Sequence, residues 1–320
     1  MLKKRKLGRT GLEVSELALG GLFIGSFGTD AASAQEVIRR AIELGINYID
    51  TAPGYTGSEQ VIGDALGKID EPCILSTKMG YKPEPFEPRN AEFLRRALAD
   101  SLKRLQRDAV DILMIHEPDR VEAMDWWEDA ESATGPVMDI LSEALETGQA
   151  RYTGLGGSTV YEMAHIVDTG KFDVLITAFN YDLLWREAGL YLLPSALENR
   201  MGIVCGSPLH QGAFARPYLR EVKGPSRWLS TPRQKQFLAL YDFVSDCGLS
   251  LPELALRFLL SDHAVSTVLT GARSVEELEN NVAAAEKGPL PEEMLEELNT
   301  IADMVPFRPM LEPLGLPFEG

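Results

Sequence analysis

The sequence predicts an α/β fold, a (β/α)8 TIM barrel with a C-terminal lid segment. Short apolar runs of strand character recur between amphipathic stretches with helical spacing, and eight such runs can be counted. No Gly/Ser-rich linker or low-complexity tract interrupts the series. Eight parallel strands joined by right-handed helical crossovers close most simply as a barrel with its helices outside. We therefore interpret residues 1–320 as a single domain.

The predicted strands are short apolar runs rich in β-branched and aliphatic residues. They are Leu17–Gly20, Tyr48–Asp50, Ile74–Thr77, Ile112–His116, Tyr152–Gly156, Val174–Ala178, Gly202–Gly206 and Val268–Gly271. In a barrel the carboxyl ends of all strands meet at one rim, so the residues that follow them are expected to lie together.

The predicted helices carry apolar residues at intervals of three and four, as in residues 91–105. They are Ser33–Leu44, Ser58–Leu66, Ala91–Leu105, Pro136–Glu146, Tyr161–Asp168, Pro194–Glu198, Pro252–Leu260 and Val275–Ala285. Three irregular stretches remain: Glu117–Gly135, Leu209–Arg233 and Pro306–Gly320. The first two follow strands and should border a pocket, and the third could fold over it as a lid.

Composition narrows the class of protein. The chain is 45% hydrophobic and 25% charged, which is typical of globular domains, and its net charge of -17 argues against a nucleic-acid partner. The three cysteines show no CxxC spacing, which indicates a reducing compartment and neither a zinc site nor a disulfide framework. No apolar run approaches the roughly 18 residues of a membrane span. We expect a cytoplasmic protein without a metal or membrane partner, and we infer no oligomeric state.

Four polar residues stand at or just beyond predicted strand ends: Asp50, Tyr55, Lys78 and His116. Carbonyl reduction delivers hydride to carbon and a proton to oxygen, and a phenol can donate that proton. The Lys78 ammonium would lower the pKa of Tyr55, Asp50 would hold the ammonium, and His116 would polarise the carbonyl. Each residue alone has an ordinary structural interpretation, but the four together favour a catalytic one.

The segments that carry these residues match a known pattern. Residues 50–55, Ser58-Glu59, Ile62-Gly63, 76–78 and 111–116 resemble the aldo-keto reductase superfamily, and the similarity extends from Leu7 to about Asn281. Residues 180–184 and 206–209 look most like the branch that contains L-galactose dehydrogenase and other aldose 1-dehydrogenases. The resemblance implies an NAD(P)-dependent oxidoreductase with the tetrad named above. It also implies oxidation of an aldose hemiacetal to a lactone, with Tyr55 as general acid/base.

The resemblance implies cofactor contacts as well. Ser158 would hold the nicotinamide carboxamide, although Thr159 replaces the family's frequent Asn, and Asn180 would contact nicotinamide or sugar. Gly206 stands where the family often has a stacking aromatic residue. The full set of cofactor candidates is Gly20, Gly21, Ser158, Thr159, Asn180, Ser207, Leu209, Gly212, Arg273, Glu277 and Asn281.

Cofactor preference depends on Glu277. Many NADP-using relatives have a cation at the aligned position, whereas a carboxylate would accept a hydrogen bond from a ribose hydroxyl and repel a 2′-phosphate. We therefore favour NAD(H). Arg273 could pair with a phosphate from the other side, and NADP(H) stays open as the alternative.

Aromatic residues are the candidates for contact with a small carbonyl or sugar substrate. Trp126 and Trp127 could stack on a sugar, Phe307 could close the pocket, and Phe23 is assigned to the same site. At least one of the two tryptophans is expected to anchor its loop instead.

Two rival functions stay open. A sugar lyase or isomerase on the same fold would need clustered His and carboxylate ligands, and His116 alone among the four histidines has a suitable position. A regulatory or redox-sensing barrel that binds cofactor without turnover is the other rival, and the complete tetrad weakens it.

Overall fold

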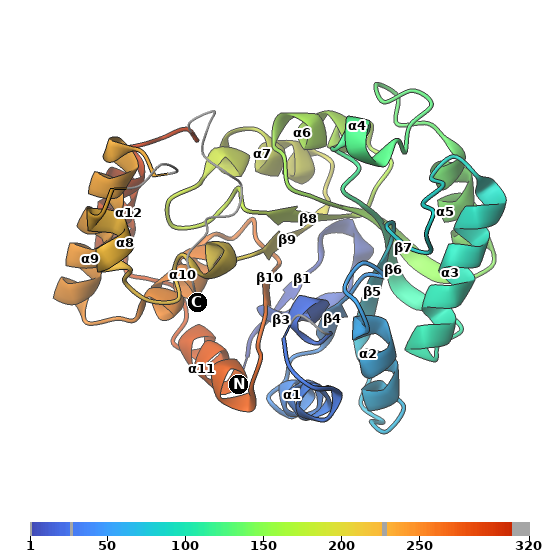
Figure 1. Ribbon diagram of the computed structural model, residues 1–320, viewed down its shortest axis with the longest axis horizontal. Helices are drawn as coiled ribbons and strands as arrows, with labels where there is room; N and C mark the ends of the chain where they lie inside the picture. The colour runs from blue at the N-terminus through green and yellow to red at the C-terminus, as the bar shows by residue number, and fades with distance from the viewer. Residues whose placement is uncertain (1, 26–27, 226–228, 309–320) are drawn as a thin grey trace.

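The computed structural model describes residues 2–25, 28–225 and 229–308. Eight parallel strands form a closed barrel in the order β10-β3-β4-β5-β6-β7-β8-β9 (Figure 1). Their bounds are β3 Leu17–Gly20, β4 Tyr48–Asp50, β5 Ile74–Met79, β6 Val110–His116, β7 Ala150–Gly157, β8 Val174–Ala178, β9 Gly202–Gly206 and β10 Thr267–Thr270. The predicted fold class is confirmed, and each predicted strand end lies within two residues of the observed one.

Strand register brings the predicted site residues to one rim. Asp50 pairs with Ser76, Lys78 with Met114, and His116 with Gly156. Side chains alternate between two sides of the sheet, as the period of a strand requires. One cluster of buried residues packs inside the barrel, and a larger one packs between the strands and the surrounding helices.

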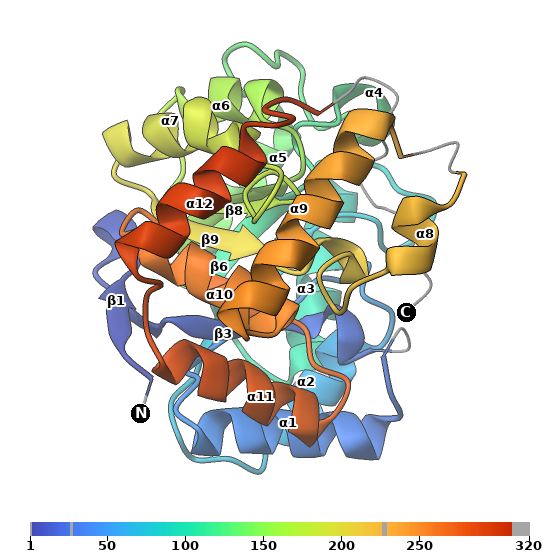
Figure 2. The same ribbon diagram turned by 90° about the vertical axis from the view of Figure 1, so that its left-hand side faces the viewer.

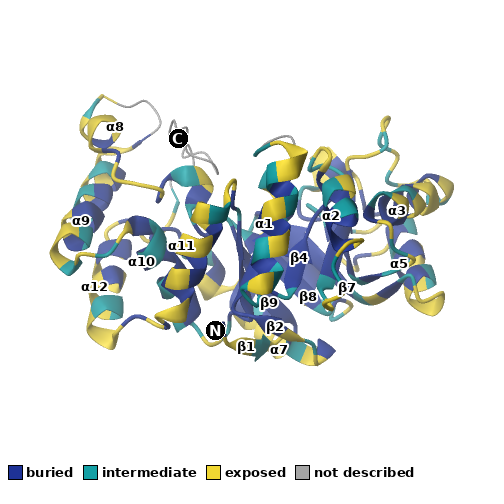
Figure 3. Cartoon of the chain, turned by 90° about the horizontal axis from the view of Figure 1, so that it is seen from below, coloured by how far each residue is buried: buried dark blue, intermediate teal, exposed yellow. Residues whose placement is uncertain are grey.

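The outer helices present buried residues to the barrel and exposed residues to solvent (Figure 3). They are α1 Ala31–Glu43, α2 Ser58–Leu66, α3 Ala91–Leu105, α5 Pro136–Glu146, α6 Tyr161–Val167, α7 Leu192–Glu198, α10 Leu251–Ser261 and α11 Val275–Glu286. Side chains of Asp30, Asn90, Ser250 and Ser274 accept hydrogen bonds from the first turns of α1, α3, α10 and α11. Such caps satisfy backbone N–H groups that would otherwise lack partners.

An N-terminal hairpin that the sequence reasoning did not predict precedes the barrel. Strands β1 Lys4–Lys6 and β2 Glu13–Ser15 pair antiparallel. Leu7 and Val14, in and beside the hairpin, belong to the interior cluster, so this segment covers the amino-terminal end of the barrel. The Arg5 guanidinium fastens it by donating to the carbonyls of Leu260, Asp262 and Val265, at 2.6, 3.0 and 2.8 Å.

Four more helices were not predicted: α4 Val121–Met124, α8 Leu219–Lys223, α9 Thr231–Cys247 and α12 Glu292–Ala302. The last three lie together at one side of the barrel, at the left of Figure 1, and Figure 2 shows α9 and α12 in front of β8 and β9. Helix α9 buries Arg233 and Gln236, and the Gln236 amide donates to the carbonyls of Ile301 and Ala302, both at 2.8 Å. Because the buried face of α9 contains a guanidinium and an amide, the helix lacks the regular apolar spacing by which an amphipathic helix is predicted.

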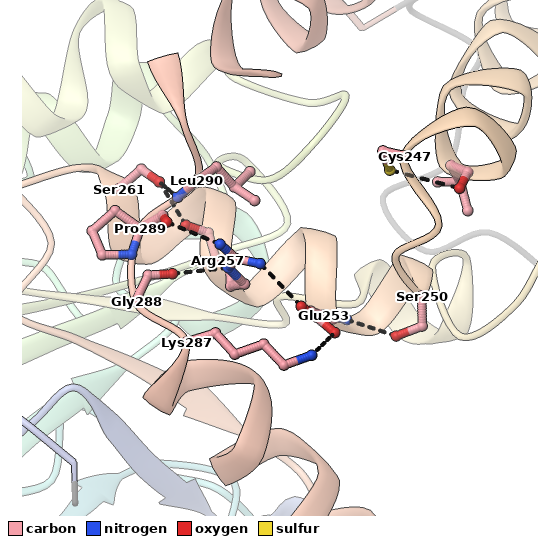
Figure 4. A network of polar contacts seen from close by, with 10 residues as sticks. Cys247, Ser250, Glu253, Arg257, Ser261, Lys287, Gly288, Pro289 and Leu290 are labelled. Carbon is pink, nitrogen blue, oxygen red and sulfur yellow. Dashed lines mark hydrogen bonds and ion pairs between the residues drawn. The ribbon is translucent and has the colours of Figure 1, made fainter. Parts of the chain in front are cut away.

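A polar network ties the connection between α11 and α12 to α10 (Figure 4). Arg257 donates to the carbonyl of Gly288 at 2.9 Å and to the carboxylate of Glu253 at 3.0 Å, and Lys287 reaches the same carboxylate at 2.7 Å. Ser261 Oγ accepts from the backbone N–H of Leu290 at 2.9 Å. Across residues 2–25, 28–225 and 229–308, each helix is too short or too polar to span a bilayer.

Candidate active site

A buried ion pair lies at the centre of the rim. Lys78 Nζ is 2.5 Å from Asp50 Oδ2 and donates to the carbonyl of Thr51 at 3.0 Å. Ser76 Oγ donates to the other carboxylate oxygen, Asp50 Oδ1, at 2.6 Å. The two charged side chains are only 2% and 4% exposed. Because an unpaired buried charge is costly, each charge depends on the other for its place in the fold.

The pKa of Lys78 reflects this environment. Burial acts to lower the pKa of the ammonium, but the Asp50 carboxylate and the Tyr55 phenol raise it, and the net direction is upward. Lys78 is therefore a permanent cation at neutral pH.

Tyr55 lies directly over the ammonium. It sits in the turn between β4 and α2, where its backbone N–H donates to Ala52 at 3.0 Å, and Lys78 Nζ is 4.9 Å from the centroid of its ring. Burial raises the pKa of Tyr55 and outweighs the Lys78 charge, which lowers it as the sequence reasoning expected. The net shift is upward, so the phenol is protonated at neutral pH and suited to proton donation.

His116 faces Tyr55 from the end of β6. The two ring centroids are 5.7 Å apart, with an interplanar angle of 88°. Burial, followed by the positive charges of Lys78 and Arg120, lowers the pKa of His116 well below its ordinary value of 6.5. The imidazole is therefore neutral. A neutral imidazole can donate one hydrogen bond to a carbonyl oxygen without competing with Tyr55 for the proton.

A cavity of about 250 Å³ borders Tyr55 on the side of α2. Glu59 and Arg104 line it and form an ion pair at 2.7 Å, and Thr77 Oγ1 donates to the other Glu59 oxygen at 2.7 Å. Thr77 precedes Lys78 in β5, so this network supports the strand that carries the ammonium.

The structure brings Ser158, Thr159 and Asn180 together beyond β7 and β8. Asn180 Nδ2 donates to the carbonyl of Ser158 at 2.7 Å, and Asp119 accepts from the N–H groups of Ser158 and Thr159 at 2.9 and 2.7 Å. Thr159 Oγ1 is buried without a hydrogen-bond partner among the described residues. Hydroxyl and amide groups of this kind match the donors and acceptors of a carboxamide.

The loop after β9 contains Ser207, Leu209 and Gly212. Its residues Ser207 and Gly212 have φ values of 57° and 95°, and Gly212 N–H donates to the Leu209 carbonyl at 2.9 Å. His210 holds the loop in place: its Nδ1 lies 2.6 Å from Asp182 Oδ2. The His210 ring also stacks on Trp185 at 3.7 Å. The sequence did not predict these anchors.

Arg273, Glu277 and Asn281, the residues predicted for the adenosine end of the cofactor, lie in and just before α11. Glu277 Oε2 accepts from the backbone N–H of Arg273 at 2.8 Å, and Asn281 is buried in the helix. The Arg273 guanidinium lies 4.7 Å from the centroid of the Phe23 ring. A Cβ added at Gly271 would approach that ring to 2.4 Å. The structure thus places the Phe23 ring beside Arg273, one of the residues predicted for the cofactor.

Gly20 and Gly21 link the ends of neighbouring strands. A Cβ at Gly21 would lie 2.7 Å from the Asp50 carbonyl, and one at Gly20 would meet the carbonyl of Thr270 at 3.5 Å. The lack of a side chain at Gly21 lets the chain pack closely against the end of β4.

The two tryptophans differ from the expectation of a stacking surface. Trp126 and Trp127 are 0% and 3% exposed, and their indole N–H groups donate to the carbonyls of His116 and Pro118 at 2.9 and 2.8 Å. Both side chains anchor the loop after β6, because a buried indole must satisfy its N–H.

The described part of the predicted lid ends at Arg308. Its N–H donates to Glu187 Oε1 at 2.7 Å and its guanidinium to the Phe179 carbonyl at 2.5 Å, which fastens the segment beside the end of β8. Phe307 is 57% exposed. Residues 309–320 of the predicted lid lie outside the described residues.

Comparisons with known proteins point to one family. The family model described as "Aldo/keto reductase family" matches residues 16–303. L-galactose dehydrogenase from Arabidopsis thaliana is 31% identical over 321 residues, with 95% of each chain covered. L-glyceraldehyde 3-phosphate reductase from Escherichia coli (strain K12) is 29% identical, with 88% of this chain and 87% of that protein covered.

A solved structure is similar over the full fold. Aldo-keto reductase AKR11C1 from Bacillus halodurans, in its holo form, superposes with a TM-score of 0.79 at 28% identity, covering 98% of this chain and 100% of the other. The chain belongs to the aldo/keto reductase family and is an oxidoreductase.

Proposed function

We propose that the protein interconverts a carbonyl and an alcohol with a nicotinamide cofactor, with Tyr55 as general acid/base. The observation that carries the proposal is the buried Asp50–Lys78 pair beneath Tyr55, with His116 facing the phenol. Tyr55 donates its proton to the substrate oxygen, and the Lys78 ammonium stabilises the phenolate that remains. His116 donates a hydrogen bond to the same oxygen. When bound, the reduced nicotinamide supplies the hydride.

Residues beyond β7 to β10 would hold the cofactor. Ser158 and Asn180 would hold the carboxamide, supported by the cluster of hydroxyl and amide groups around them. The loop after β9, with Ser207, Leu209 and Gly212, would approach the pyrophosphate. The start of α11, with Arg273, Glu277 and Asn281, would hold the adenosine end.

For the substrate we propose an aldose, oxidised at its anomeric carbon to a lactone. In this direction Tyr55, as phenolate, would accept the proton of the anomeric hydroxyl, and the oxidised nicotinamide, when bound, would accept the hydride of that carbon. The sugar thus loses one proton and one hydride, and its anomeric carbon becomes the carbonyl carbon of the lactone. The similarity to L-galactose dehydrogenase supports this choice.

The test is a screen of aldoses and small aldehydes with NAD⁺, NADP⁺ and their reduced forms, read from the nicotinamide absorbance. We expect at least one aldose to reduce the oxidised cofactor and at least one aldehyde to oxidise the reduced one. Tight cofactor binding with no absorbance change for any compound would contradict the enzymatic proposal and favour a cofactor-binding sensor.

We predict a preference for NAD(H), measured as the ratio of kcat/KM for the two cofactors. The backbone of Arg273 fixes the Glu277 carboxylate at the start of α11, and the Arg273 guanidinium is held over Phe23. A carboxylate within about 4 Å of a 2′-phosphate costs on the order of 1 kcal/mol or more, so the ratio should favour NAD(H) about tenfold. Glu277→Gln should bring the kcat/KM values for the two cofactors closer together. Glu276 is exposed on the same turn, and Glu276→Gln should leave their ratio unchanged. A wild type that prefers NADP(H) would overturn the prediction.

A further inference from the structure

Three polar side chains that the sequence reasoning did not single out form a row beside His116. The Tyr81 ring meets the imidazole edge-on, with centroids 5.0 Å apart, and its hydroxyl donates to Glu117 Oε2. Glu117 Oε1 lies 3.3 Å from Arg120 Nε, and Arg120 Nη2 donates to Ser158 Oγ at 3.0 Å. The row therefore runs from the imidazole that would bind the substrate oxygen to the hydroxyl that would bind the carboxamide.

The backbone is shaped to place this row at the rim. Tyr81 and Glu117 have φ values of 64° and 49°, a conformation that costs about 1–2 kcal/mol for a residue with a side chain. The Glu117 N–H donates to the Gly156 carbonyl at 2.6 Å, so the chain turns immediately after the last pair of β6 with β7. Strain of this kind gathers where a side chain must be aimed at a functional site.

The row has unused capacity for hydrogen bonds with hydroxyl groups. Glu117 is 19% exposed at its side chain, and burial raises its pKa while Arg120 lowers it. A carboxylate offers about four acceptor positions, and the Tyr81 hydroxyl uses one of them. A plain hydrocarbon chain bound against Glu117 would displace water from its free acceptor positions without replacing those hydrogen bonds, which costs binding free energy.

The charges of Glu117 and Arg120 also distinguish anionic substrates from neutral ones. Arg120 alone would attract a substrate phosphate or carboxylate. The Glu117 carboxylate, 3.3 Å from the guanidinium, offsets that attraction and repels an anion. A neutral hydroxylated compound avoids the repulsion and can bond with both groups.

Resting on the proposed function, we propose that Glu117, together with Arg120 and braced by Tyr81, selects the substrate. The selected class is neutral carbonyl compounds with hydroxyl groups on the carbons next to the reacting one. Aldoses belong to this class, whereas unhydroxylated and phosphorylated aldehydes do not.

A matched series of three-carbon aldehydes tests the proposal: propanal, glyceraldehyde and glyceraldehyde 3-phosphate. Reduction by wild type and by Glu117→Gln is compared as kcat/KM, because Gln keeps the size of the side chain and removes its charge. In the variant we expect the ratio of glyceraldehyde to propanal to fall about tenfold, the loss of one charge-assisted hydrogen bond. The ratio of glyceraldehyde 3-phosphate to glyceraldehyde should rise about tenfold as the repulsion is removed.

Two further variants make the outcome decisive. Arg120→Gln should lower the ratio of the phosphorylated to the neutral aldehyde, the opposite of Glu117→Gln. Glu122→Gln changes an exposed carboxylate on α4, in the same loop, and should leave both ratios unchanged. Unchanged ratios in Glu117→Gln, or an equal loss for all three aldehydes, would overturn the selection proposal. A wild type that reduces no carbonyl compound at all would instead contradict the proposed function.

Discussion

Replacing Tyr55 by Phe is expected to lower kcat by about 10³-fold or more, because the substrate oxygen loses its proton donor. The hydroxyl is removed from a ring whose packing against His116 remains. Cofactor binding should change by less than about twofold, since the proposed cofactor contacts lie beyond β7 to β10. Steady-state kinetics and a cofactor titration followed by fluorescence measure the two quantities separately.

The matched control is Tyr161→Phe. Tyr161 lies on α6 and is 58% exposed, so its variant should keep full turnover. A Tyr55→Phe enzyme that retains turnover within about tenfold of wild type would be decisive against the proposed role of this phenol.

The pH profile supplies an independent signature of Tyr55. Burial raises the pKa of this phenol above its ordinary value of 10.0, so reduction should stay level through neutral pH and decline only in the alkaline range. Oxidation, which needs the phenolate, should rise toward the same range. Because the pKa of His116 is well below 6.5, the profile should show no inflection near that pH. An inflection there that is absent in His116→Gln would contradict a neutral imidazole.

Replacing Lys78 by Met is expected to reduce both turnover and stability. The Tyr55 phenolate would lose its counterion, and the Asp50 carboxylate, 4% exposed, would remain buried without a cation. Breaking a buried pair by removing one partner costs about 3–5 kcal/mol of unfolding free energy. We expect kcat to fall about 10²-fold or more, measured beside the denaturant midpoint of the same sample.

The double variant Asp50→Asn, Lys78→Met separates the two effects. The amide introduced in place of the Asp50 carboxylate is neutral and can still accept a hydrogen bond from Ser76, so much of the lost unfolding free energy should return. Turnover should not return, because the phenolate still lacks its ammonium. Recovery of turnover together with stability would show that Lys78 acts only as a structural partner of Asp50.

Much of the fold and the tetrad could be predicted without coordinates. Each barrel strand is a short apolar run, and parallel strands must bring their carboxyl ends to one rim, so Asp50, Lys78 and His116 had to converge once eight strands were counted. Two helix starts also have local N-cap residues, although no cap was predicted: Ser274 precedes α11, and Asp30 precedes α1. These features depend on local sequence and on the periods of helix and strand.

Other features depend on contacts between distant segments. Helix α9 buries Arg233 and Gln236 and satisfies the Gln236 amide on α12, which no local hydrophobic pattern reveals. Trp126 and Trp127 anchor their loop because their indole N–H groups donate to buried carbonyls. From the sequence alone, an aromatic pair in an irregular stretch is equally consistent with a binding surface. Burial and charge are properties of the assembled rim, so the direction of the Tyr55 pKa emerges only there.

The row of Tyr81, Glu117 and Arg120 depends on both local sequence and contacts between distant segments. Its residues follow β5 and β6 within four positions. Two of them, Tyr81 and Glu117, adopt positive φ values that redirect the chain, and strain of this sort is sustained only by surrounding structure. The amino-acid pattern therefore specified which groups reach the rim. Packing, through burial and three-dimensional proximity, set their orientation, their protonation and the partners they meet.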